Sequence, residues 1–400
     1  MGSVIDKWAS IASAEGLAGA GPLREWGEPT AGYGPVPGRA VDVSVIVPTY
    51  DVEKYLRQAV TSALDNDEVD IDVIIVDDGS HDASLEIAMN LASLDPRVSV
   101  IHKGNGGYGS AVNRGLDAAT GEYVAILEPD DWVEPHMYDR LFAMAKSAEA
   151  ASGRPVDIMK SSYWRIVDPG LPTETRMHCS YYRRLSVRDG RPFVLADEPG
   201  LVRHHPSIWS ALYRRGFLEA NGIRMREVPG AGWVDNPWLY ETMCRAESIV
   251  YTDEAWYCYR EALPGSSSSG DVSMLSLERW NDMMDILEGL GIDDRGIRSS
   301  LHIVGFRYLQ EILAKGHDSI PEVRAAYEAM LRRMDLSIVS GLDCVPPSVR
   351  RLAFDANGAE VPQMDGHAYR MVLAREFGKT IRTDGLGVAM MKVRKKLARR

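Results

Sequence analysis

The chain has 400 residues, 45% of them hydrophobic, which is enough to bury one large core or the cores of two domains. Its formal net charge of -12 argues against a general nucleic-acid binder, because such proteins usually carry a basic face that neutralises phosphates. The four cysteines form no CxxC or zinc-type pair, so neither a disulfide framework nor a structural zinc site is indicated: Cys179, Cys244, Cys258 and Cys344.

Residues 1–40 are rich in Ala, Gly and Pro and show no sustained hydrophobic period, so we predict an N-terminal extension to which no chemistry is assigned. No basic segment followed by an apolar run opens the chain, and no run of about eighteen apolar residues occurs in it. These features predict a soluble protein that works in the reducing cytoplasm.

Short apolar runs and helical patterns alternate from residue 43 onward. They predict strands at 43–47, 73–76, 98–101 and 123–127, and helices between them at 52–64, 85–94 and 110–119. This alternation is typical of an α/β fold with a mainly parallel sheet and helices on both faces. The segment GSSSSGD is typical of a linker or loop, and helical periodicity dominates after it. We therefore predict an α/β domain at 41–270 and a mostly helical C-terminal region at 271–400.

A polar cluster follows each predicted strand: PTYD, DDGSHD, HKGNGG and EPDD, in chain order. Ligands of parallel sheets bind beyond the carboxyl ends of the strands, so the four clusters are expected to converge on one site. In LEPDDW, residues 127–132, three clustered carboxylates indicate a divalent cation with oxygen ligands, which would clamp a diphosphate. The alternative is a solvated acidic turn that caps the helix starting near Glu134.

The segment VDDGSHD, residues 76–82, is the second acidic strand end. A structural interpretation explains Gly79 as a turn and Ser80 or Asp82 as a helix cap, but it does not need two adjacent aspartates. An acceptor-only side chain at this position is suited to hydrogen-bond the imide N–H of a pyrimidine or the hydroxyls of a ribose.

Three segments together resemble the family-two glycosyltransferases, which have the Rossmann-like GT-A fold: SVIVPTYDVEKYLRQAV, VDIDVIIVDDGSHDAS and NGGYGSAVNRGLDAATGEYVAILEPDDW. The resemblance runs from about residue 43 to about 137 and continues more weakly to about 269. It implies a nucleotide-sugar donor, Mg²⁺ or Mn²⁺, and transfer with inversion at the sugar.

By this resemblance, Pro48, Tyr50 and Asp78 lie around the nucleotide base. Asp130 and Asp131 contact the ribose, the metal and the diphosphate, both being metal ligands. Glu128 departs from the family, in which Asp is more usual, and a side chain longer by one methylene leaves its contact with the metal open.

The segment HKGNGGYGSAVNRG, residues 102–115, resembles a donor-site loop and brings Asn113 to the nucleotide sugar. It matches neither a Walker loop nor GxGxxG after the first strand. The alternative is that its glycines form only a turn and that Arg114 is a surface charge.

The acceptor side and the base are expected in residues 206–260. By resemblance Asp235 is the base that removes the acceptor proton, although relatives commonly have Glu-Asp where this chain has Val-Asp; a helix N-cap is the alternative. Trp233, beside it, is the expected acceptor contact, while the nearby aromatics either stack on sugars or form core: Trp209, Tyr213 and Trp238. Arg260 would neutralise the leaving diphosphate or form a surface salt bridge.

The last nine residues, KVRKKLARR, include six basic ones, which form either a solvated tail or a peripheral contact with anionic lipid at the inner face of the membrane. The sequence as a whole predicts a transferase that moves a sugar, from a UDP-sugar, to a carbohydrate or lipid-linked acceptor in polysaccharide or glycolipid synthesis, with no nucleic-acid partner. Two rivals are a nucleotidyltransferase, whose phosphate loop is absent after the first strand, and a protein that only binds nucleotide sugars.

Overall fold

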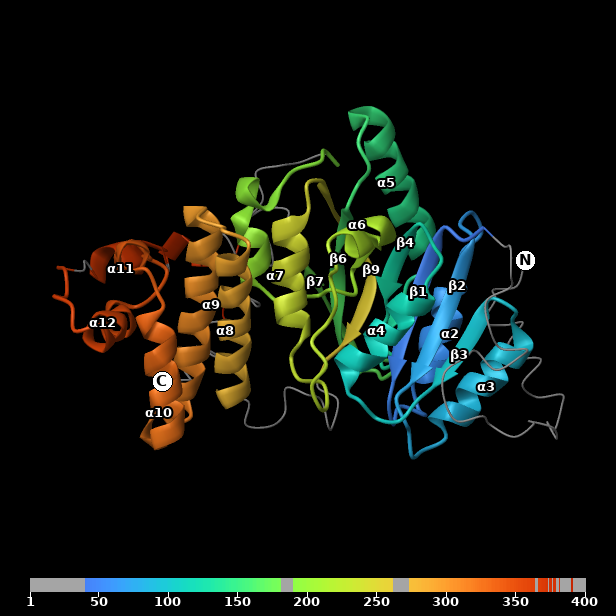
Figure 1. Ribbon diagram of the computed structural model, residues 1–400, viewed down its shortest axis with the longest axis horizontal. Coiled ribbons are helices and arrows are strands. Elements are labelled where there is room, and N and C mark those ends of the chain that lie inside the picture. The colour runs from blue at the N-terminus through green and yellow to red at the C-terminus, as the bar shows by residue number, and fades with distance from the viewer. Residues whose placement is uncertain are drawn as a thin grey trace. The chain divides into compact units, whose positions relative to one another are not determined.

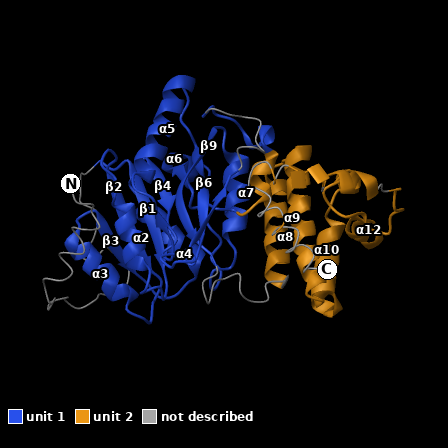
Figure 2. Ribbon diagram, turned by 180° about the vertical axis from the view of Figure 1, so that it is seen from behind, with its two compact units in different colours: residues 1–198, 206–269 blue, residues 199–205, 270–400 orange. Residues whose placement is uncertain are grey.

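The computed structural model describes residues 40–180, 190–261, 273–363 and 366–372, and positions 374–375, 377–378, 381 and 390. Contacts divide the chain into two compact units, residues 1–198 with 206–269, and residues 199–205 with 270–400 (Figure 2). The second unit includes the short segment 199–205, which the sequence assigned to the first domain. The predicted N-terminal extension, the GSSSSGD segment and the basic KVRKKLARR segment lie outside the described residues, apart from residue 40.

Four parallel strands form one half of the sheet in the first unit, in the order β3-β2-β1-β4 (Figure 1). They are β1 (Val43–Thr49), β2 (Ile71–Asp77), β3 (Val98–His102) and β4 (Tyr123–Ile126). Every residue of β1 and β2 is buried, which explains their nearly continuous apolar sequences. The pairing aligns Thr49 with Asp77 and Asp77 with His102, so the carboxyl ends of β1, β2 and β3 lie at one edge of the sheet. The predicted parallel α/β arrangement is confirmed.

Helices α2 (Leu56–Ala63), α3 (Ser84–Leu94) and α4 (Tyr108–Ala118) connect these strands. Helix α4 approaches β1 closely at Gly115, where an added Cβ would lie 2.4 Å from Cγ2 of Ile46. Glycine at this position therefore sets how near α4 lies to the sheet, and with it the height of the helix N-terminus above the strand ends.

The other half of the sheet is mostly antiparallel and continues the order as β4-β8-β6-β9-β5, with β7 paired to β6. Its elements are β5 (Trp132–Val133), α5 (Met137–Ser152), β6 (Ile158–Val167), β7 (Thr175–Cys179), η1 (Leu195–Asp197), β8 (Ala211–Arg214), α6 (Arg215–Ala220), α7 (Asp235–Arg245) and β9 (Ile249–Arg260). The two residues of β5 pair with the end of β9, and this pairing brings residues 258–260 beside the acidic turn after β4.

The second unit is helical in its described part, as predicted. It contains η2 (Pro199–Arg203), α8 (Ser273–Gly289), α9 (Arg295–Ala314), η3 (His317–Ser319), α10 (Pro321–Arg332), α11 (Leu336–Ser340) and α12 (Pro347–Ala356). Gly305 of α9 lets the buried Trp280 of α8 approach, since an added Cβ would lie 2.6 Å from its indole nitrogen. Arg203 of η2 donates to Ser300 of α9 at 2.9 Å, which fastens this short segment to the helices. Among the described residues, no helix has the length and apolar character needed to cross a membrane.

Candidate active site

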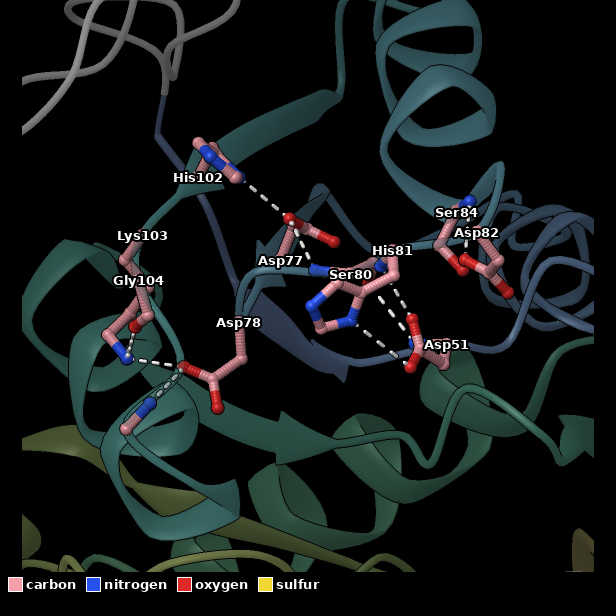
Figure 3. A network of polar contacts seen from close by, with 11 residues as sticks. Asp51, Asp77, Asp78, Ser80, His81, Asp82, Ser84, His102, Lys103 and Gly104 are labelled. Carbon is pink, nitrogen blue, oxygen red and sulfur yellow. Dashed lines mark hydrogen bonds and ion pairs between the residues drawn. The ribbon is translucent and has the colours of Figure 1, made fainter.

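The two aspartates at the end of β2 are held by different partners (Figure 3). Asp77 is fully buried, and its Oδ2 lies 2.7 Å from Nδ1 of His102. Asp78 is 3% exposed; its Oδ1 accepts from Lys103 and from the backbone N–H of Gly106 at 2.9 Å, and its Oδ2 accepts from the N–H of Gly107 at 2.8 Å. In this structure Asp78 therefore holds the glycine loop against the end of β2. Its contact with a nucleoside stays a prediction.

The loops that follow β1 and β2 are bonded to each other. The N–H of Asp51 donates to Ser80 Oγ at 3.1 Å, and the N–H of His81 donates to Asp51 Oδ1 at 2.7 Å. Tyr50 is 41% exposed, and its hydroxyl lies 3.3 Å from Nδ1 of His81, with the two rings edge to face. Pro48 is buried within β1. Of the residues predicted around the base, Tyr50 is the one that presents an open ring.

The carboxylate of Asp131 faces into the protein. Its side chain is 1% exposed; Oδ2 accepts from the Tyr257 hydroxyl at 2.9 Å, and Oδ1 accepts from the N–H of Arg260 at 2.7 Å. Burial, followed by the charge of Asp130, raises the pKa of Asp131 well above its ordinary value. Asp131 thus fastens β9 to the acidic turn. Of the predicted metal pair, the half-buried Asp130 is the one with an accessible side chain.

Glu128 is bonded to the start of α4. Its Oε1 accepts from the Tyr108 hydroxyl at 2.6 Å, and its backbone N–H donates to the Tyr257 hydroxyl at 3.1 Å. Burial, with the charges of Asp130 and Asp235, raises the pKa of Glu128 to about 8. Burial and the charges of Glu128 and Asp235 also raise the pKa of Tyr108. These effects mean that residues from three segments, the start of α4, the acidic turn and the start of α7, lie close together.

Arg260 is 9% exposed and is held from several sides. Its guanidinium carbon lies 4.8 Å from the ring centroids of both Tyr55 and Trp132, Nε donates to the carbonyl of Asp130 at 2.8 Å, and Nη2 donates to Gln58 at 2.9 Å. Its charge also opposes the rise that burial causes in the pKa of Asp130. Arg260 is thus a buried residue held by these groups, and the alternative of a surface salt bridge does not describe it. Its contact with a diphosphate stays a prediction.

Asp235 begins α7 and is half-buried. Its Oδ1 accepts from the backbone and side-chain nitrogens of Asn236, each at 3.0 Å, and burial raises its pKa to about 6. The described contacts include no side-chain capping bond at this helix terminus. A carboxylate with a pKa near 6 is suited to accept a proton at neutral pH.

The aromatic residues near Asp235 divide into core and surface. Trp209, Tyr213 and Trp238 are all less than 5% exposed, and Trp209 stacks on Tyr257 with centroids 4.0 Å apart. These three belong to the core. Trp233 is half-buried and has a positive φ of 50°, in the loop just before Asp235. Of these four aromatic residues, Trp233 is therefore the candidate for a contact with the acceptor.

Asn113 lies in α4, 7% exposed, and is bonded to the segment that precedes Asp235. Its Nδ2 donates to the Met225 carbonyl and to Glu227 Oε1, both at 2.9 Å, and its Oδ1 accepts from the N–H of Met225 at 2.9 Å. Both hydrogens of the amide are therefore used within the protein. The predicted donor contact gains no support from this geometry, and a structural role is what the contacts describe.

The residues of the acidic turn fit a divalent cation that is bound together with the phosphates of a substrate. Among the described residues, no group of three or more His, Cys, Asp or Glu side chains is arranged to hold a metal ion by itself. Mg²⁺ and Mn²⁺ that act on nucleotides usually bind one or two carboxylates together with the phosphates of the substrate. Asp130, half-buried beside Glu128, meets this requirement.

Three residues of the site were missed by sequence reasoning: Lys103, Tyr108 and Tyr257. Each acts by linking segments that are distant in the chain, for example Tyr108 to Glu128 and Tyr257 to Asp131. Lys103 and Tyr108 stand in the glycine-rich segment that was singled out, so its location was the available signal. Nothing in the sequence of β9 marks Tyr257.

Residues 44–217 match the model of the family described as "Glycosyl transferase family 2". The chain is 32% identical over 226 residues to "Uncharacterized glycosyltransferase EpsJ" of Bacillus subtilis (strain 168), covering 55% of this chain and 61% of that protein. It is 33% identical to "Putative glycosyltransferase EpsH" of the same organism, covering 54% of this chain and 60% of that one. The chain thus spans about three fifths of the length of these two relatives.

Among solved structures, S. aureus TarS 1-349 in complex with UDP-GlcNAc superposes with a TM-score of 0.61 over 86% of this chain and 92% of that chain, at 18% identity. TarS 1-349 alone gives a TM-score of 0.59 at 19% identity. Likeness at this level of identity shows a shared fold. The family match begins in the first strand and continues into α6, so over residues 44–217 this chain is similar to glycosyl transferase family 2, and its fold is the GT-A fold.

Proposed function

We propose that the protein transfers a sugar from a nucleoside diphosphate sugar, specifically a UDP-sugar, to an acceptor hydroxyl with inversion at the anomeric carbon. The observation that carries the proposal is that the start of α4 joins the end of β2 to the acidic turn, through hydrogen bonds to Asp78 and Glu128, where the charges of Asp130 and Asp235 raise the pKa of Glu128. The UDP-GlcNAc complex of TarS, a protein of the same fold, supports the nucleotide class.

On the donor side, Tyr50 offers an open ring to the base and Asp78 a carboxylate to the uracil or ribose. Asp130 would bind Mg²⁺ or Mn²⁺, which supplies positive charge to the diphosphate when bound. Arg260, adjacent to Asp130, adds a fixed cation for the charge that develops on the leaving diphosphate.

On the acceptor side, Asp235 is the base. The acceptor oxygen forms a bond to the anomeric carbon while the bond from that carbon to the diphosphate oxygen breaks, and the hydroxyl proton passes to the Asp235 carboxylate. Trp233 would hold the acceptor through the apolar face of its ring. We propose a carbohydrate or lipid-linked acceptor in polysaccharide or glycolipid synthesis, a setting that the glycosyltransferase relatives support.

The test measures release of nucleoside diphosphate from a panel of nucleotide sugars, with Mn²⁺, with Mg²⁺ and with EDTA, for the wild type and for Asp235→Asn. We expect turnover with a UDP-sugar and metal, and a loss in Asp235→Asn of at least about 100-fold, within the range known for removal of a general base. UDP affinity, measured by calorimetry, is expected to stay within about twofold in the variant, because Asp235 does not contact the nucleotide in this proposal.

One result would overturn the proposed transfer, and a second would overturn the base assignment alone. Binding of donor without turnover in the wild type would leave a protein that only binds nucleotide sugars. Undiminished transfer by Asp235→Asn would remove Asp235 from the role of base while leaving the transferase activity in place.

A further inference from the structure

Residues 224–230, which we call the docked segment, run along α4 toward its N-terminus. At one end, Arg224 donates to Asp117 of α4 at 3.1 Å. One turn nearer the helix start, Asn113 bonds Met225 and Glu227 through both ends of its amide. The contacts therefore follow the helix axis in order.

The docked segment then lies against Gly109, in the first turn of α4, and against Gly107, the N-cap residue of this helix. A Cβ added to Gly109 would lie 1.9 Å from the carbonyl oxygen of Arg226, and one added to Gly107 would lie 2.1 Å from that of Val228. Real Cβ atoms do not approach a carbonyl so closely, so both positions exclude any larger residue while the segment stays in place. At the last contact, the N–H of Tyr108 donates to the Gly230 carbonyl at 2.9 Å.

The same turn of α4 also holds the donor side of the site. Asp78 accepts from the N–H groups of Gly106 and Gly107, and the Tyr108 hydroxyl donates to Glu128. Gly107 and Tyr108 thus contact Asp78 at the end of β2, the acidic turn and the docked segment within two residues. Only four residues separate Gly230 from Asp235, and φ is positive at Gly230, Gly232 and Trp233.

We propose that α4 positions the base: Asn113 and the glycines at its start hold the docked segment, and through it Asp235, in register with the donor site. This inference rests on the proposed function, and it makes Asn113 a positioning residue where the sequence predicted a donor ligand. A shift of about 1 Å in a catalytic group can lower turnover by about 100-fold. Loosening the docked segment therefore affects kcat more than donor affinity.

The kinetic test compares Asn113→Ala and Gly109→Ala with the wild type. Asn113→Ala removes the three amide bonds, whereas Gly109→Ala keeps the Asn113 side chain and forces the Arg226 carbonyl away. Alanine inside a helix is favoured over glycine by about 1 kcal/mol, so the second variant is expected to fold. We expect kcat to fall by about 10- to 100-fold in both, with the Kd for UDP in the presence of Mn²⁺ within about twofold of the wild type.

The matched control is Asn66→Ala. Asn66 is a buried asparagine of the same unit, and its amide also bonds backbone groups, those of Ala63, Tyr138 and Asp139. It makes none of its described bonds to the docked segment. We expect this variant to lose stability and to keep the wild-type kcat, which separates positioning from a general loosening of the fold.

Hydrogen exchange tests the docking without any substrate. We expect faster exchange of the amides of residues 225–235 in Asn113→Ala and Gly109→Ala, and no change there in Asn66→Ala. Unchanged exchange in both α4 variants would overturn the docking. A higher Kd for UDP with kcat unchanged in Asn113→Ala would restore the donor contact and overturn the positioning role. A wild type without turnover would overturn the proposed function and the base assignment, while the exchange result would still decide whether α4 holds the segment.

Exchanging the amide and the carboxylate between positions 113 and 227 provides a test by rescue of kcat. Asn113→Asp places a carboxylate beside Glu227 and removes two donors, so we expect it to lower kcat at least as much as Asn113→Ala. Adding Glu227→Gln supplies an amide that donates to the new carboxylate. Recovery of several-fold in kcat in the double variant supports the contact, and equal loss in the single and double variants contradicts it.

Discussion

Asp235 is a half-buried carboxylate whose pKa is raised to about 6, chiefly by burial. A base must be ionised to accept a proton, so we expect kcat/KM to rise tenfold per pH unit below about pH 6 and to level off above it. The measurement is a pH profile of transfer at low donor concentration in the presence of metal. An acidic limb with its midpoint near pH 4, the ordinary range of an aspartate, would contradict the assignment.

Lys160 is the third residue of β6 and is 1% exposed. Its Nζ donates to the Ser207 carbonyl at 2.8 Å and to the Ser207 hydroxyl at 3.0 Å, and burial lowers its pKa to about 7. In the unfolded chain the pKa returns to about 10.4, so between these values the unfolded chain binds more protons. Its contribution to stability is therefore complete above the unfolded pKa and is lost as the pH falls toward 7.

We accordingly expect the free energy of unfolding to increase from pH 7 to pH 8.5 by about 1–2 kcal/mol more in the wild type than in Lys160→Met. Urea unfolding at the two pH values measures this difference, and groups other than Lys160 contribute equally to both proteins. Equal pH dependence in the two proteins would mean that the buried amine keeps an ordinary pKa.

At the residue scale, the sequence pointed to candidate residues but not to the contacts that those residues make within the protein. Strand ends and family motifs single out Asp78, Asp130 and Asp235, whose roles stay predictions. The inward orientation of Asp131 could not be predicted, since it depends on Tyr257 and Arg260, about 130 positions away in the chain. The partners of Asn113 could not be predicted for the same reason, because they come from residues 225–227.

The packing of α4 on β1 depends on Gly115. An added Cβ would lie 2.4 Å from Cγ2 and 3.0 Å from Cγ1 of the fully buried Ile46. Gly115→Ala gains about 1 kcal/mol of helix propensity but overpacks the core at a cost of about 1–3 kcal/mol, so we expect a net loss of up to about 2 kcal/mol. Denaturant unfolding provides the measurement.

Gly289 at the end of α8 is the control, because an added Cβ would meet nothing within 4 Å. We expect Gly289→Ala to be neutral or to stabilise the protein by up to about 1 kcal/mol. If the two variants behaved alike, the close approach of α4 to β1 would not limit stability.

At the element scale, hydrophobic period identified the parallel strands and their helices, because each of those elements is long and regular. The two-residue β5 gave no such signal, although its pairing with β9 aligns the acidic turn with Arg260. The sequence also contains no sign that residues 199–205 belong to the helical unit, since this depends on contacts with distant residues, such as that of Arg203 with Ser300. Local periodicity cannot report contacts of that kind.

For the whole molecule, ligand binding and unfolding are linked. A ligand that binds the folded state at 100 times its Kd stabilises it by about 2.7 kcal/mol. We expect UDP with Mn²⁺ to raise the unfolding temperature of the wild type, and EDTA to remove most of the effect. In Asp130→Asn the shift should be small at the same concentrations, because the accessible carboxylate of the acidic turn is lost. A full shift in that variant would place the cation elsewhere.

The crowding between the start of α4 and the docked segment has a consequence for engineering this protein. A loop taken from another transferase to change acceptor choice would arrive with backbone carbonyls shaped for its own helix. Here the helix leaves no space for a side chain at Gly107 or Gly109. The docked segment and the first turn of α4 therefore have to be exchanged together. Grafts that replace both should retain activity more often than grafts of the segment alone.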